Sequence, residues 1–154
     1  MRYLSTAVLG LAATVLSITP ALAAPPEPQP TEPFAVEGCD FPVEAELTGK
    51  TKIIEHNGFT TFTAPNARAT LTNTNTGESV SYVVTGVVRD IPTDTGIISR
   101  FTGHNLLAGP AIDGILLTTG SQTFVASSPE DPEATLTESH GKVLNVCDVL
   151  APAT

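Results

Sequence analysis

The chain has 154 residues, of which 41% are hydrophobic and 15% charged, a balance typical of one globular domain and of neither a disordered nor a membrane-embedded chain. Its 7 basic and 16 acidic residues give a net charge of -9, which repels nucleic acid and anionic lipid surfaces at long range. Tryptophan is absent and aromatic residues make up 5%, whereas Thr, Val, Gly and Pro are frequent, and this mixture favours strands and turns over helices.

The first 23 residues have the pattern of a secretory signal peptide. Arg2 supplies a positive start, Ala7–Ile18 is a short apolar run, and Ala21–Ala23 is an A-x-A cleavage site. The run is shorter than the roughly 20 apolar residues that span a bilayer, and no cysteine follows the site to accept a lipid. We therefore expect a secreted, extracellular protein without stable membrane insertion. A retained N-terminal anchor is the alternative.

Residues 24–38 form a Pro-rich segment with interspersed glutamates. Because proline fixes φ and lacks an N–H donor, we expect an extended spacer between the signal peptide and a single all-β domain at residues 39–154. A Pro-rich recognition ligand is the alternative interpretation.

Alternation of apolar and polar residues with a period of two predicts strands through the first half of this domain. In chain order they are expected at Phe41–Thr48, Thr51–His56, Phe59–Thr63, Ala67–Thr74 and Gly77–Arg89. Asn57-Gly58 is the strongest short hairpin signal among the turns between them.

In the second half we expect one long strand followed by two hairpins, which turn at Gly120-Ser121 and at His140-Gly141. These strands are expected at Ile97–Leu107, Ile115–Thr119, Gln122–Ala126, Ala134–Ser139 and Lys142–Leu150. No window has a sustained helical period, so almost no helix is expected. The predicted fold is an antiparallel meander of about 8 to 10 short strands forming a small barrel or sandwich.

The run Gly77–Arg89 is the longest uninterrupted strand-like stretch, and we expect it to be a central strand. If it pairs with Ile97–Leu107 around the intervening loop, Gly86 lies opposite Gly103. Two glycines that meet across a ladder mark a bend, a bulge or a close backbone approach.

The two cysteines, Cys39 and Cys147, are expected to form a disulfide, because export places them in an oxidising compartment. Closing a loop of this size stabilises a fold by about 4 to 5 kcal/mol in the chain-entropy model. We expect the bridge to join the first and last strands, which favours a closed or nearly closed sheet. Two separate buried thiols are the alternative.

The space left by the two facing glycines is the most specific candidate for a small-molecule site. The residues expected at or around it are Tyr82, Gly86, Arg100, Gly103, His104 and Asn105. A bend in the sheet with ordinary polar residues at its rim is the alternative.

No catalytic signature and no cofactor or metal site is predicted. None of the three histidines has another His or Cys at a metal-ligand spacing. The acidic segment Pro129–Glu133 lacks the ligand order of a calcium loop, and there is no G-x-S-x-G motif.

The segments T-G-H-N-L-L, at Thr102–Leu107, and C-D-V-L-A, at Cys147–Ala151, resemble a pattern in small exported actinobacterial proteins of unknown function. This resemblance implies a compact, two-cysteine β-fold behind a signal peptide. It brings no catalytic residue to this chain.

The leading hypothesis is a non-enzymatic secreted domain that binds a partner protein or a small apolar ligand. A first alternative is a small β-barrel enzyme, an isomerase or hydrolase, with a cavity near His104. A second is a protease inhibitor with a protruding loop at Asp90–Gly96 or Ser127–Glu133.

Overall fold

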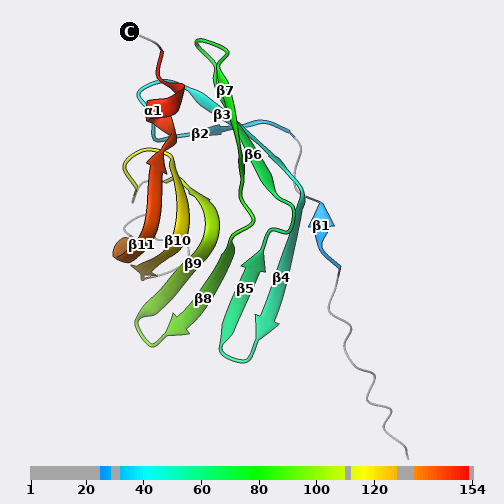
Figure 1. Cartoon of the computed structure of the whole chain (residues 1–154). Coiled ribbons are helices and arrows are strands. Elements are labelled where there is room, and N and C mark those ends of the chain that lie inside the picture. The colour runs from blue at the N-terminus through cyan, green and yellow to red at the C-terminus, as the bar shows by residue number, and fades with distance from the viewer. Residues whose placement is uncertain (1–24, 29–31, 110–111, 128–133, 153–154) are drawn as a thin grey trace, which may run out of the picture.

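The structure is a computed structural model, and it describes residues 25–28, 32–109, 112–127 and 134–152. The predicted signal peptide and the acidic segment Pro129–Glu133 lie outside the described residues. Two antiparallel sheets dominate, which confirms the all-β prediction (Figure 1). Among the described strands the order of both sheets is open, so neither sheet closes into a barrel.

The smaller sheet has four strands. Their order is β2 (Phe34–Val36), β3 (Val43–Thr48), β6 (Arg68–Asn73) and β7 (Ser79–Val83). The larger sheet has seven strands and is strongly curved (Figure 1). Their order is β1 (Glu27–Pro28), β4 (Lys50–His56), β5 (Phe59–Thr63), β8 (Val87–Thr93), β9 (Gly96–Leu107), β10 (Leu116–Ala126) and β11 (Thr135–Asn145).

The main core lies between one face of the four-stranded sheet and the neighbouring ends of β9, β10 and the C-terminal segment. The period of two in β3 turns Val43 and Ala45 inward, while Glu44 on the other face is exposed. The rest of the buried cluster consists of Ala69, Leu71, Ile115, Val146 and Leu150. This face therefore matches the amphipathic pattern that the sequence predicts.

The Pro-rich segment is more than a spacer, because it supplies β1 and β2. Glu27 pairs with Thr51 at the edge of the larger sheet, and Phe34 pairs with Ala45 at the edge of the smaller one. Pro28 is tolerated in β1 because β1 is an edge strand, which leaves one row of backbone groups unpaired.

The run Gly77–Arg89 is divided between the two sheets, so the prediction of one central strand is wrong. β7 forms an edge of the four-stranded sheet and β8 lies within the seven-stranded sheet. The chain crosses between them at Val84, whose N–H donates to Ala67, and at Gly86, whose N–H donates to the carbonyl of His104 at 2.7 Å. Local alternation continues through the crossing, which is why the sequence pattern does not reveal it.

The two hairpins predicted at Gly120-Ser121 and His140-Gly141 do not form. Each is the middle of one continuous strand, β10 or β11. Gly103, Gly120 and Gly141 pair directly across three strands, with φ values of 85°, 131° and 112°. These glycines bend the strands at one level instead of reversing the chain.

The last strand predicted, Lys142–Leu150, ends at Asn145, and a short helix α1 (Val146–Leu150) follows. The Asn145 side chain accepts a hydrogen bond from the Cys147 N–H at 3.0 Å and caps the helix. Buried Val146 and Leu150 then complete the core. Within the described residues, no helix is long and apolar enough to span a bilayer.

The predicted disulfide between Cys39 and Cys147 is confirmed, with a Cα–Cα distance of 5.4 Å. It links the loop before β3 to α1, and so it fastens the two sheets to each other instead of joining two strands of one sheet. The bridge thus joins the regions near the two ends of the domain, although Cys39 lies just before β3 and Cys147 in α1 instead of within the first and last strands.

Candidate functional site

The two central glycines of the predicted site lie where the sequence placed them. The ladder between β8 and β9 ends at the pair Val87 and Thr102, directly beside the two glycines. A Cβ added to Gly103 would lie 3.5 Å from the Cα of Gly86. The close backbone approach expected from the two glycines is thus present.

The space beside Gly86 is occupied by Asn105. A Cβ on Gly86 would lie 2.0 Å from the Asn105 Oδ1 atom. Asn105 is buried, and its Nδ2 atom donates to the carbonyl of Thr102 at 3.1 Å. The volume that the missing side chain frees is therefore used for packing a polar side chain.

The other three predicted residues lie in different surroundings. Tyr82 packs against the core under the four-stranded sheet. Arg100 and His104 are exposed, and the alternation of β9 turns them to the face opposite Asn105. The structure brings Gly86, Gly103 and Asn105 together, but it does not add Tyr82, Arg100 and His104 to one cavity with them.

The two loops that a protease inhibitor would use are only partly described by the structure. β8 continues to Thr93 and turns tightly into β9 at Gly96, so Asp90–Gly96 is a hairpin instead of a protruding loop. Apart from Ser127, the second candidate loop lies outside the described residues. In the described part of the chain, no three His, Cys, Asp or Glu side chains gather at a distance suited to a metal ion.

An apolar row, which the sequence did not predict as a surface, crosses one face of the larger sheet. It consists of Ile53, Phe62, Val88 and Phe101, which are direct neighbours on β4, β5, β8 and β9. At the usual strand spacing the row is about 15 Å long. Its exposure rises toward the sheet edge, where Phe62 is 37% and Ile53 60% exposed.

The inner end of the apolar row is anchored in packed side chains. The ring of Phe101 meets the ring of buried Phe124 edge-on, with centroids 5.5 Å apart. Phe101 also pairs across the ladder with Gln122, which is buried. The inner end of the apolar row is therefore packed against buried side chains, and its outer half, Phe62 and Ile53, is exposed.

A polar row runs parallel to the apolar row on the same face of the sheet, two residues away along each strand. It consists of Glu55, Thr60, Asp90 and Ser99. Thr60 donates to Glu55 at 2.8 Å, and Ser99 donates to Asp90 at 2.7 Å. These hydrogen bonds hold two carboxylates beside the apolar side chains, where they give this surface a negative edge.

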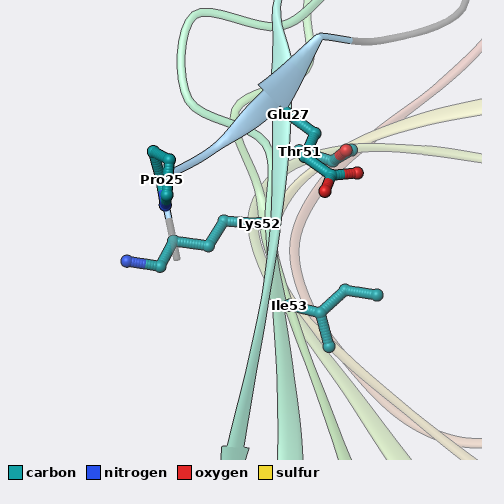
Figure 2. A pocket seen from close by; sticks show the side chains of 5 residues that line it. All are labelled: Pro25, Glu27, Thr51, Lys52 and Ile53. Carbon is teal, nitrogen blue, oxygen red and sulfur yellow. The ribbon is translucent and has the colours of Figure 1, made fainter. Parts of the chain in front are cut away.

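A shallow pocket of about 160 Å³ lies at the end of the apolar row, between β1 and β4. Its lining residues are Pro25, Glu27, Thr51, Lys52 and Ile53 (Figure 2). Ile53 and Lys52 point to opposite sides of β4, as the alternation of a strand requires. The pocket is smaller than the roughly 300 Å³ of the smallest usual ligand sites, so it fits one side chain better than a drug-sized molecule.

The signal for the apolar row was present in the sequence only in part. Ile53 and Phe62 occupy the apolar positions of a predicted hairpin. That Val88 and Phe101 continue the same row depends on β5 pairing with β8, a contact between segments that are not adjacent in the chain.

Comparison of the chain with protein-family models, with curated proteins and with solved structures finds no match.

Proposed function

We propose that the protein is a secreted, non-enzymatic binding domain whose apolar row docks an extended segment of a partner protein. The observation that carries this proposal is the exposure of Ile53 and Phe62 at the outer end of the row. Contiguous apolar side chains at a surface are typical of interaction sites. The Cys39–Cys147 disulfide supports an extracellular location, because disulfides persist in oxidising compartments.

The chemistry of the partner follows from the two neighbouring rows. Apolar side chains of the partner would cover Ile53 and Phe62, and Lys or Arg side chains would lie against Glu55 and Asp90. The net charge of -9 favours such a basic partner at long range. A partner rich in Asp or Glu would be repelled.

The backbone of β4 offers a way to hold such a segment in place. β1 pairs only with Lys50 and Thr51, so in the described part of the chain no strand covers the outer edge of β4 from Lys52 to His56. An extended peptide can add to an open strand edge through main-chain hydrogen bonds, while alternate side chains enter neighbouring pockets. The pocket beside Ile53 would take one of these side chains.

A library of random twelve-residue peptides displayed on phage tests the proposal. Selection uses the mature protein, and counter-selection uses the double variant Ile53→Ser/Phe62→Ser. Both substitutions lie at exposed positions, so the variant should keep its fold, which circular dichroism verifies. We expect enriched peptides that combine apolar residues with Lys or Arg and bind the variant at least about tenfold more weakly.

Two outcomes would overturn the proposal. One is that no peptide is enriched over the variant. The other is that the enriched peptides are acidic or bind the variant as well as the parent. Val83→Ser is a matched control, because Val83 is also an exposed apolar residue but lies on β7 in the other sheet, and it should leave peptide binding unchanged.

A further inference from the structure

The strand at the other edge of the larger sheet, β11, has an unusually open surface. It has 11 residues, and all of them are exposed except Asn145, which is half-buried. β10 is its neighbour on one side, and among the described strands none lies on the other. A long edge with unpaired N–H and C=O groups is a template for pairing with another chain. Figure 1 shows β11 at the outer margin of the curved sheet.

Two copies of one strand can pair around a two-fold axis only in certain registers. In an antiparallel ladder, both backbone groups of a residue point to the same side, and this side alternates along the strand. The residues that face outward on both copies must therefore meet each other. The two-fold axis then passes through one residue that lies opposite itself.

The charges of β11 select one of these registers. When the axis passes through His140, Glu138 of each copy lies opposite Lys142 of the other, so two ion pairs form. An axis at Gly141 places Lys142 opposite His140 and leaves Glu138 beside an apolar residue. Opposite charges that face each other across a ladder stabilise it, whereas like charges destabilise it.

The position of Glu138 within its own sheet suits this pairing. Its carboxylate accepts a hydrogen bond from the Thr123 hydroxyl at 3.4 Å on the neighbouring strand, and so it is held in place on the sheet. Lys142 is exposed, two pleats away on the same face. The sheet thus presents the anion and the cation on one face, with His140 midway between them.

An exposed apolar side chain near the end of β11 also gains a partner in this register. Val143 is 52% exposed. With the axis at His140, Val143 lies opposite Thr137 of the second copy, and the regular ladder ends there because the register of β11 against β10 shifts between Glu138 and Leu136. The same register therefore covers apolar surface and pairs charges, as a self-complementary two-fold interface requires.

The other open edge of the sheet lacks this property. On the part of β4 that no described strand covers, from Lys52 to His56, Lys52 lies at an even position and Glu55 at an odd one. Because a two-fold axis pairs even positions only with even ones, no such register sets Glu55 opposite a lysine. Self-pairing is therefore favoured at β11 and not at β4.

We propose that β11 pairs antiparallel with β11 of a second copy of this chain around a two-fold axis at His140, which joins the two seven-stranded sheets into one. The residues of β11 that carry this inference are different from those of the apolar row that carry the proposed peptide site. Sedimentation velocity of the mature protein, from low micromolar to millimolar concentration, should show a reversible dimer.

Charge variants test the register. Lys142→Glu sets like charges opposite each other twice, and we expect it to raise the dimer Kd by about tenfold or more. Adding Glu138→Lys to Lys142→Glu restores both ion pairs in swapped order and should restore dimerisation. Lys50→Glu changes the net charge equally on β4, at the opposite side of the sheet, and should leave the dimer intact.

The proposal is overturned if the mature protein stays monomeric at every concentration. It is also overturned if Lys142→Glu dimerises as well as the parent, or if the charge swap remains as weak as the single variant. A dimer abolished by Ile53→Ser/Phe62→Ser but not by Lys142→Glu would assign self-association to the apolar row instead.

Discussion

The side chain of Asn105 occupies the position that a Cβ atom on Gly86 would need, with its Oδ1 atom 2.0 Å from that position. The two residues lie on neighbouring segments, since the N–H of Gly86 donates to the carbonyl of His104. The absence of a side chain at residue 86 is thus a packing requirement at the point where the chain crosses between the sheets.

Gly86→Ala is therefore expected to lower the free energy of unfolding by about 1 to 3 kcal/mol, because the added methyl group overpacks this contact. Gly86 does not have a positive φ, so backbone strain does not contribute to the cost. Urea unfolding of Gly86→Ala, Asn105→Ala and the double variant measures the coupling. In the Asn105→Ala background the alanine should cost less, and equal costs in both backgrounds would disprove the packing explanation.

Gly120 tests a different effect, the bend in β10. Its φ is 131°, and an added Cβ would lie 2.1 Å from the backbone carbonyl oxygen of His140. Gly58 is a matched control, because it also has a positive φ, 92°, but no atom lies within 4 Å of an added Cβ. We expect Gly120→Ala to cost at least about 1 kcal/mol more unfolding free energy than Gly58→Ala. Equal costs would mean that glycine is needed at position 120 only for its positive φ.

Removal of the disulfide by Cys39→Ser/Cys147→Ser should lower the free energy of unfolding by about 4 to 5 kcal/mol, because the sequence separation of 108 makes the closed loop long. Chemical denaturation with and without reductant measures this loss. Reductant should have no further effect on the double variant. If reduction leaves the unfolding midpoint of the parent unchanged, the bridge does not stabilise the contact between α1 and the β2–β3 loop.

Asn73 connects β6 to the end of α1 through a buried hydrogen bond. Its Nδ2 atom donates to the carbonyl of Leu150 at 3.0 Å, and its Oδ1 atom accepts from the N–H of Asn75. Asn73→Leu keeps the branched shape of the side chain but enlarges it at a buried position and leaves the Leu150 carbonyl without this donor, so we expect a loss of at least about 1 to 3 kcal/mol in unfolding free energy. Asn75→Leu, at an exposed position of the same turn, should change stability little. A similar loss in both variants would contradict the role of the buried bond.

The sequence by itself determined the features that depend on local pattern and on covalent chemistry. Alternation placed β4, β5 and β9 almost at their observed limits, and counting around the β8–β9 turn set Gly86 opposite Gly103. The pairing of Cys39 with Cys147 also followed, because no other cysteine is present.

Only the tertiary structure decided which sheet each strand joins. Alternation with a period of two is the same in both sheets, so the division of Gly77–Arg89 into β7 and β8 left no local signal. Gly120 and Gly141 resembled turns because a glycine in the sequence can mark either a turn or a bend within a strand. In the structure they face each other across two strands and bend them. The apolar row exists because segments distant in the chain pair in one register, and the edge of β11 is open because none of the other described strands pairs with it there. Such pairing is a property of the folded chain alone.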